Sequence, residues 1–468
     1  MAAQAHMDVG GILRPEGRLE LSIALQPYSQ VLGERAAAHL LRRAGFGGTP
    51  DEIRRYASMG AQNAAAALLD VPPASEIAPP PEATVAGRVP MREGRRVVAA
   101  VQLWWLNRML ATPAPLQEKM TLYFHGHFTS RATALFPQIT YNQNALFRAN
   151  ATGNLRELTH AVSKDGAMLI YLNGANNVAE HPNENYAREL MELFTLGVDN
   201  YTEEDVRESA RAWTGWRIDR ARDRVWFDPQ RHDAGRKTFL GRTGYWDGDD
   251  IVDIIFDQPQ CARFFATSLL NWFVYNDPEP ALVDGVAQLL RSHNYELTPV
   301  LRTILASNVF YSQRAYRALV KSPVEFVVGT YKTLGLPTID ASALPALQQM
   351  GQNLFYPPSV AGWPGGANWL TSGTMIARQN FLTRLIGSQT LSDSPWLRRL
   401  PVKPSSAAQI LTQTILQGDV STAALAELEG YLRGSGSAAL ASLSVENYDQ
   451  RVSGAAYLTM ATPAYQLN

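Results

Sequence analysis

The chain has almost no cysteine and almost no net charge. Cys261 is the only cysteine, so neither an intrachain disulfide nor a cysteine-based zinc site can form. It stands in a helical run next to Phe264 and Phe265, which favours a small core residue over a nucleophile. Basic residues number 42 and acidic residues 43, a formal net charge of -1. This balance argues against a general nucleic-acid binder, and no nucleic-acid partner is expected.

Long apolar runs and several ligand-binding motifs are also missing. No apolar stretch is long enough to span a bilayer. The N-terminus lacks the charged and apolar regions of a secretory signal, so the sequence predicts a cytoplasmic protein; a periplasmic or secreted protein is the alternative if the start is not native. There is no P-loop, no dinucleotide-binding glycine fingerprint and no nucleophile elbow. No nucleotide cofactor is therefore expected.

Strand signals are scarce as well. Capped helical periods dominate, and strand-like alternation is confined to an irregular insert at about 217–249. The sequence predicts an all-α protein, with a large multi-helix body, a small irregular or β-hairpin insert and a C-terminal helical subdomain. At 468 residues the chain exceeds the size at which one core normally stops growing. We divide it into an N-terminal arm at 1–33, a main helical domain at 34–387 and the C-terminal subdomain at 388–468.

The stretch from His181 to Gly197 is the most informative part of the chain. It predicts one helix with Asn183 as N-cap, and Gly197 suits the left-handed position after the helix end. Apolar residues recur on it at three- and four-residue spacing, as on a core-facing stripe. These residues are Tyr186, Leu190, Leu193 and Phe194.

The same stretch resembles the signature segment of a bacterial family known as domain of unknown function 1800 (DUF1800). Further matches follow in the order expected for that family, at Phe124-His125-Gly126-His127-Phe128, Tyr201-Thr202-Glu203-Glu204-Asp205-Val206, Trp213-Thr214-Gly215-Trp216, His232-Asp233-Ala234-Gly235-Arg236-Lys237-Thr238 and Gly362-Trp363-Pro364-Gly365-Gly366. The resemblance covers roughly residues 36–386 and, more weakly, the extreme C-terminus. It implies no activity, because none is assigned to the family. Relatives are often exported and commonly occur beside a second uncharacterised protein, which implies a protein partner.

The carboxylates of the signature helix are candidate functional groups. Asn185, Glu189 and Glu192 share a face beside the apolar stripe. If that face is buried, the two acids must be paired, protonated or bound to a metal; if it is exposed, they form an ordinary helix surface. Arg188 could neutralise one of them or pair with Glu184, which would make the group an internal ion-pair network. The functional interpretation makes Glu189 and Glu192 metal ligands, Glu184 a catalytic residue, and Asn185 and Arg188 substrate contacts.

Two histidines in one short motif are candidate metal ligands. His125 and His127 are two residues apart, so they point about 200 degrees apart on a helix but to one side of an extended segment. They can chelate one metal only if the helix has ended by Gly126. The alternative is one histidine packed in the core and the other at a helix end.

A third candidate group lies in the irregular insert. His232, Asp233 and Lys237 place an imidazole, a carboxylate and an ammonium within six residues. This grouping is typical of acid/base catalysis or of an anion-binding rim, and we assign all three a catalytic role. The alternative is a loop that uses Asp to cap a turn and Lys for solubility.

Three tryptophans are candidate substrate contacts, because aromatic faces bind sugars and other flat ligands. They also fit the more common use of tryptophan as core filler. They are Trp213, Trp216 and Trp363.

Together these groups support two hypotheses of different classes. The first is a soluble helical enzyme with a His/carboxylate site, in which a divalent metal ion assists hydrolysis or oxidation of a small-molecule or polymer substrate. The second is a non-catalytic binding or assembly protein that acts with a partner protein. The enzyme hypothesis predicts that His127, Glu189 and His232 converge on one site. It also predicts that Glu189 is largely buried against Arg188, a histidine or a metal.

Overall fold

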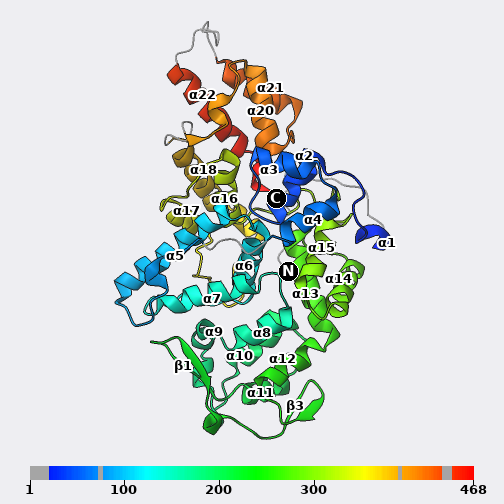
Figure 1. The fold of residues 1–468 in the computed structure, drawn as a ribbon, viewed down its shortest axis with the longest axis vertical. Helices are drawn as coiled ribbons and strands as arrows, with labels where there is room; N and C mark the ends of the chain where they lie inside the picture. The colour runs from blue at the N-terminus through cyan, green and yellow to red at the C-terminus, as the bar shows by residue number, and fades with distance from the viewer. Residues whose placement is uncertain (1–20, 72–76, 388–392, 435–444) are drawn as a thin grey trace, which may run out of the picture.

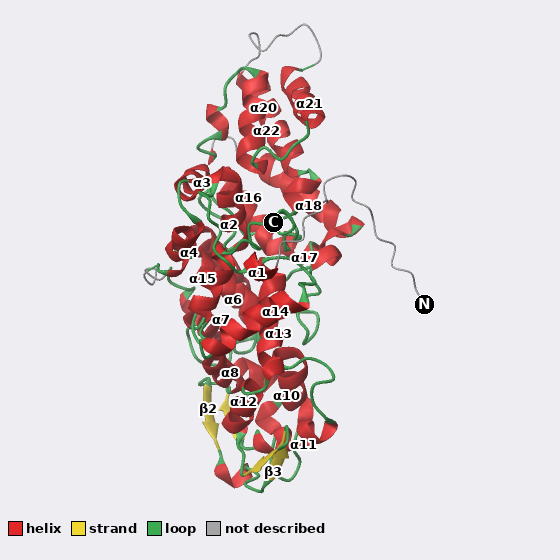
Figure 2. Ribbon diagram, turned by 90° about the vertical axis from the view of Figure 1, so that its right-hand side faces the viewer, coloured by secondary structure: helices red, strands yellow, loops and turns green. Residues whose placement is uncertain are grey.

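The computed structural model describes residues 21–71, 77–387, 393–434 and 445–468. The protein is 60% helical, and the strands of its described part form two small antiparallel hairpins. The prediction of an all-α protein with a small β insert is therefore confirmed. The molecule is elongated, with helices α20 to α22 at one end and the hairpins at the other (Figures 1 and 2). Within the described ranges, no helix is both long and apolar enough to cross a membrane.

The first half of the chain forms helices joined by short loops. Their bounds are α1 Leu21–Ala24, α2 Gly33–Arg43, α3 Pro50–Ala57, α4 Ala61–Leu69, α5 Met91–Ala111, α6 Pro115–His127, α7 Pro137–Ala149, α8 Leu155–Ser163, α9 Gly166–Tyr171, α10 Glu184–Glu189 and α11 Glu203–Ala212.

Two hairpins interrupt the helices where the irregular insert was predicted. The strands are β1 Trp216–Asp219 with β2 Arg224–Phe227, and β3 Lys237–Phe239 with β4 Arg242–Gly244. Helices then resume as α12 Gly248–Phe256, α13 Pro259–Phe273, α14 Pro280–Ser292, α15 Leu297–Ala306, α16 Pro323–Leu334, α17 Ala343–Gln349, α18 Ser372–Gly387, α20 Pro404–Leu416, α21 Thr422–Arg433 and α22 Val445–Met460.

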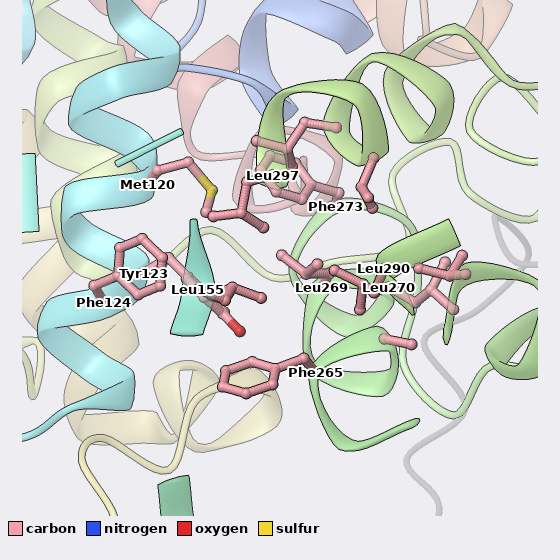
Figure 3. Packing of buried hydrophobic residues seen from close by; sticks show 14 of the residues in the cluster. Met120, Tyr123, Phe124, Leu155, Phe265, Leu269, Leu270, Phe273, Leu290 and Leu297 are labelled. Atoms are coloured by element: carbon pink, nitrogen blue, oxygen red, sulfur yellow. The ribbon is translucent and has the colours of Figure 1, made fainter. Parts of the chain in front are cut away.

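Two hydrophobic cores hold these helices together. The first gathers side chains from α1 to α4, α6 to α10 and α11 to α15. The second joins α5 to α16, α17, α18 and α20 to α22. Burying one Leu or Phe side chain contributes about 1.5–3 kcal/mol, so each core is a large stabilising term. Figure 3 shows part of the first core, with Met120, Tyr123, Phe124, Leu155, Phe265, Leu269, Leu270, Phe273, Leu290 and Leu297.

Helix α6 lies between the two cores and carries a fully buried carboxylate. Glu118 accepts hydrogen bonds from Trp105 Nε1 at 2.8 Å, from Arg108 Nε at 2.5 Å and from Arg148 Nε at 2.6 Å. Burial by itself raises the pKa of Glu118, but Arg148 and Arg108 outweigh it and hold the pKa below its ordinary value. The carboxylate therefore stays charged and fixes α5 and α7 against α6.

Removing this carboxylate should be costly. Glu118→Ala leaves Arg108 and Arg148 buried without their acid, so we expect the free energy of unfolding to fall by about 3–5 kcal/mol. Urea unfolding followed by circular dichroism measures the change. The control is Glu427→Ala on the exposed face of α21, which should stay within about 0.5 kcal/mol of the parent. Equal effects of the two variants would contradict the structural role of Glu118.

A histidine joins α8 to α12 near the signature segment. His160 Nδ1 lies 3.0 Å from Asp249 Oδ1, and its Nε2 lies 3.1 Å from Asp253 Oδ1. Carboxylates only accept, so both ring nitrogens must carry a proton and the ring is an imidazolium. Partial burial lowers the pKa of His160, but the bonds to Asp249 and Asp253 outweigh it and raise the pKa.

This contact should make stability depend on pH. Because the pKa of His160 is raised on folding, its contribution is complete below the unfolded pKa of about 6.5 and is lost as pH rises through the folded value. We expect His160→Gln to lower the free energy of unfolding most at acidic pH and least at alkaline pH. Chemical denaturation of both proteins across this range measures the difference. A difference that stays constant with pH would show that the ring acts through packing alone.

Candidate functional site

The signature segment is a helix that changes type halfway. α10 ends at Glu189, and Leu190–Thr195 continues it as a π-helix. Asn183 caps the start through its Oδ1, and Gly197 follows the end with φ of +83°, both as predicted. The π-helical turn was not predicted; its wider spacing shows in the bond from Leu196 N to the carbonyl five residues back, at 2.8 Å. Such turns inside helices are frequent at functional sites.

Arg188 forms its ion pairs with Glu184 and Glu203. It pairs with Glu184 at 3.3 Å and, through two nitrogens, with Glu203 at 2.7 and 2.8 Å. The predicted ion pair between Arg188 and Glu184 is therefore present. No ion pair or hydrogen bond joins Arg188 to Glu189 or Glu192 in the described part of the chain.

Glu189 and Glu192 consequently interact with each other as like charges. Both side chains are partly buried, so the expectation that Glu189 is largely buried holds only in part. Burial raises the pKa of Glu189, the neighbouring Glu192 carboxylate raises it further, and Arg188 opposes the shift only in part. These causes favour the protonated form of Glu189 relative to that of a free carboxyl group.

Two phenols lie beside the carboxylate pair, and one of them also interacts with a guanidinium. The Tyr201 hydroxyl donates to Glu192 Oε2 at 2.6 Å, and burial followed by this contact raises the pKa of Tyr201 to about 12. Tyr171 at the end of α9 is close enough to Glu189 for the carboxylate to raise its pKa, after burial, while Arg131 lowers it. The Glu189 carboxyl, the Glu192 carboxylate and the side chains of Tyr171, Tyr201 and Arg131 are named here the carboxylate-pair site.

His125 and His127 do not form a shared metal site. α6 continues through Gly126 to His127, so the two rings point to different sides of a helix. Phe355 N donates to His125 Nε2 at 3.0 Å, which occupies the lone pair that a metal would need. His125 is packed among aromatic rings, and burial lowers its pKa to about 3. The core interpretation fits His125 better than metal binding does.

His127 closes the end of the signature helix. Its Nε2 lies 2.9 Å from the Phe194 carbonyl oxygen, and because a carbonyl only accepts, Nε2 carries the proton. The last carbonyls of a helix have no partner within the helix, so this bond satisfies one of them. Burial lowers the pKa of His127 to about 4, so the ring is neutral at neutral pH. His127 therefore positions the helix that carries Glu189 and Glu192.

His232 has the geometry of an oriented base. Its Nδ1 lies 3.0 Å from the Thr214 carbonyl oxygen, which requires a proton on Nδ1. Nε2 has no hydrogen-bond partner among the described residues and can accept one. Phe227 holds the ring in an edge contact at 5.1 Å between centroids. His232 thus keeps its predicted catalytic potential.

Asp233 and Lys237 hold the loop that presents His232. Arg211 binds Asp233 with two nitrogens, at 2.7 and 3.2 Å, and these bonds are the main cause of its lowered pKa. Lys237 is buried, and its Nζ donates to the carbonyl oxygens of Asp233 and Gly235. Both side chains are thereby occupied within the loop and are not free to act on a ligand as predicted.

Asn177 connects two of the family motifs and α11, and sequence reasoning missed it. Its amide donates to the Ala210 carbonyl at 2.8 Å and accepts from Asn183 N at 2.8 Å, while its own carbonyl accepts from Gly215 N at 3.1 Å. The amide therefore links the start of the signature helix to α11 and to the tryptophan motif. Its position in the Asn-rich loop 173–177 was the only signal available.

The three tryptophans lie in different places. Trp213 is buried against Tyr186, and half-buried Trp216 packs on Phe227 across the first hairpin. Trp363 contacts the His125 ring at 5.3 Å, beside Gly362, where an added Cβ would lie 2.6 Å from the Gly126 carbonyl oxygen. Each of the three tryptophans therefore packs against a different partner in the described part of the chain.

The predicted three-residue convergence is not formed as a metal site. His127 is bonded to the Phe194 carbonyl, His232 to the Thr214 carbonyl, and Glu189 lies with Glu192. Within the described ranges, no three His, Cys, Asp or Glu side chains lie close enough together to hold a metal ion. Of the predicted site residues, the structure brings Glu189 and Glu192 together. Asn185 is exposed.

Gly215 should be essential for the His232 loop. It adopts φ of +98°, and an added Cβ would lie 2.9 Å from the Asp228 carbonyl oxygen and 3.2 Å from His232 Cβ. We expect Gly215→Ala to lower the free energy of unfolding by about 1–3 kcal/mol from backbone strain, with a further loss from these contacts. Thermal unfolding measures the loss.

Gly241→Ala provides the matched control, because φ is +76° there but nothing lies within 4 Å of the added Cβ. The control should show the strain alone. Equal losses in the two variants would show that the close approach to His232 has no cost of its own.

Comparison with known proteins identifies a family and little more. The family model described as "Protein of unknown function (DUF1800)" matches residues 39–467. No curated protein and no solved structure matches the chain. The family match runs through α20 to α22, further than the resemblance at 36–386 indicated. Since it covers nearly the whole sequence, the chain belongs to the DUF1800 family.

Proposed function

We propose that the chain is an acid/base hydrolase whose reaction centre is the carboxylate-pair site. One observation carries the proposal: Glu189 and Glu192 lie together as like charges, while Arg188, the cation on the same helix, is bound to Glu184 and Glu203. Two adjacent carboxyl groups with different surroundings are the usual means of keeping one protonated acid and one charged base at the same pH.

The surroundings assign the two roles. Burial and Glu192 raise the pKa of Glu189, and this direction suits the role of general acid toward an oxygen leaving group. Glu192 accepts the Tyr201 hydroxyl, which fixes the orientation of its carboxylate, and it acts as the base that activates water. Tyr171 lies near Glu189 and also interacts with Arg131, so this phenol and guanidinium would contact the polar part of the substrate. A glycosidic or ester bond of a small molecule or polymer fits this chemistry.

The proposal also includes a second form of the same site, in which the two carboxylates bind a divalent metal ion. Of the predicted ligands, Glu189 and Glu192 are the two that lie together, whereas His125 Nε2 and His127 Nε2 are used in hydrogen bonds to the backbone. Any ion held by the two carboxylates would need water or substrate as its other ligands. Such an ion would supply Lewis-acid catalysis of hydrolysis or assist an oxidation.

The test measures turnover of chromogenic glycosides and esters by the full chain and by Glu189→Gln and Glu192→Gln. We expect kcat to fall about 10²- to 10⁴-fold in each variant, because a positioned acid or base contributes that much. The parent should lose activity as pH rises through the raised pKa of Glu189, since a general acid must be protonated. Glu204→Gln, an exposed acid paired with Arg207, should keep full activity.

Elemental analysis of the same proteins separates the two forms of the site. Near-stoichiometric Zn, Mn, Fe or Cu in the parent that is lost from both Gln variants would support the metal-dependent form. Activity without bound metal would support proton transfer alone. Full activity in folded Glu189→Gln and Glu192→Gln would rule out the carboxylate pair as the reaction centre.

The binding or assembly protein is the second candidate, and a specific observation favours it. Many residues of the family motifs are engaged inside the chain, as Arg188 is with Glu203, Arg211 with Asp233 and Asn177 with Gly215. In that case the motifs maintain a rigid surface for a partner protein. A parent that turns over no substrate, together with a Glu189→Gln variant of lowered melting temperature, would favour this candidate.

A further inference from the structure

A small cavity lies between α2, α16, α20 and the residues that follow α22, far along the chain from the carboxylate-pair site. Its volume is about 20 Å³. That is room for one water molecule or one ion of similar size. Arg42, Lys321, Glu325 and Tyr465 are among its lining residues.

The protein around this cavity carries more buried positive charge than negative charge. Six buried cations interact here and are at most 8% exposed: Arg42, Arg43, Lys119, Arg317, Lys321 and Arg378. The acids among their partners are two, Glu325 and Asp419. Buried charge without a counter-charge is very unfavourable, so such an excess calls for an anion.

Four of the six cations have most of their hydrogen bonds supplied by the chain, although the buried Nε atoms of Arg43 and Arg378 have no partner among the described residues. Lys119 pairs with Glu325, and Arg317 pairs with Asp419 at 2.8 Å. Arg43 donates to three backbone carbonyl oxygens, and Arg378 donates to the Lys321 carbonyl oxygen at 2.7 Å. None of these four lines the cavity.

The two cations that do line the cavity make few side-chain hydrogen bonds. Arg42 makes one side-chain bond, from Nη1 to Gln417 Oε1 at 2.5 Å, and its buried Nε and Nη2 have no hydrogen-bond partner among the described residues. The Lys321 ammonium lies 3.8 Å from the centre of the Tyr465 ring, and the described residues supply it with no hydrogen bond. Glu325 also lines the cavity and acts electrostatically on Lys321, but its ion pair is with Lys119. Both groups therefore have donors to offer at the cavity.

We propose that this cavity binds a monoatomic anion, chloride or bromide, between Arg42 and Lys321. The volume excludes tetrahedral oxyanions such as sulfate and phosphate, which need more room than one water molecule. The Arg42 and Lys321 side chains offer only N–H donors. These donors can bind a halide in place of a carboxylate oxygen. Burial and then the neighbouring guanidiniums lower the pKa of Arg42 to about 10 and depress that of Lys321, and a bound anion relieves both effects.

The experiment uses the full chain freed of halide in a methanesulfonate buffer. Sodium chloride, sodium bromide and sodium sulfate are then added at matched ionic strength, and the melting temperature is recorded. A ligand that binds only the folded state raises the free energy of unfolding. Above the dissociation constant, this increase grows with the logarithm of the ligand concentration. We expect chloride and bromide to raise the melting temperature by several degrees in this manner, and sulfate to lack the halide-specific increment.

Lys321→Met should lose the halide-specific increment. Lys332→Met is the matched control, because Lys332 is equally buried but pairs with Glu52 at 3.4 Å and does not line the cavity. It should keep the increment. If Lys321→Met does not fold, crystals of the parent soaked in bromide give an independent result, an anomalous peak between Arg42 and Lys321. If the parent shows no halide-specific shift and no bromide peak, the proposal is overturned. The chain then balances its own charge.

Discussion

The rest of the structure depends on the buried polar side chains of α6, each of which has a bonding partner. Glu118 is held by Trp105, Arg108 and Arg148, and Lys119 on the next position pairs with Glu325 of α16. These bonds fix α5, α7 and α16 around α6, whose apolar side chains face both cores. A buried ion pair contributes little net stability compared with an apolar pair, but it tolerates only one arrangement of its partners. The orientation of α6 then determines where His125 and His127 lie.

The same constraint reaches the carboxylate-pair site through His127. Its bond to the Phe194 carbonyl ties the end of the π-helix to α6, and Asn177 ties the start of the signature helix to α11 and Gly215. With both ends held and Arg188 engaged by Glu203, Glu189 and Glu192 remain close together without a bonded cation. The bonds made by His127, Asn177 and Arg188 are therefore structural, and they hold the segment that carries the two acids.

Local signals in the sequence predicted the fold well. The N-cap at Asn183, the glycine after the signature helix and the hairpin-sized insert all follow from short-range backbone preferences, and they occur as expected. The site was predicted only in part, because it depends on distant partners. The Phe355 amide that occupies His125 and the Glu203 carboxylate that draws Arg188 away leave no trace in the spacing of the motifs. The π-helical turn was not predicted either, since Leu190, Met191, Glu192 and Leu193 are good α-helix formers.

The second core has a consequence for the order in which the chain can fold. It packs the apolar face of α5, residues 91–111, against helices that begin at residue 323, and Lys321 bonds through its backbone to Gln466. During synthesis α5 therefore emerges long before its packing partners exist. Trp104 and Trp105 meet Tyr141 and Glu118 early, but the part of the face that packs on α16 stays uncovered until more than two hundred further residues have been added. Contacts so distant along the chain slow folding and leave apolar surface of α5 exposed meanwhile.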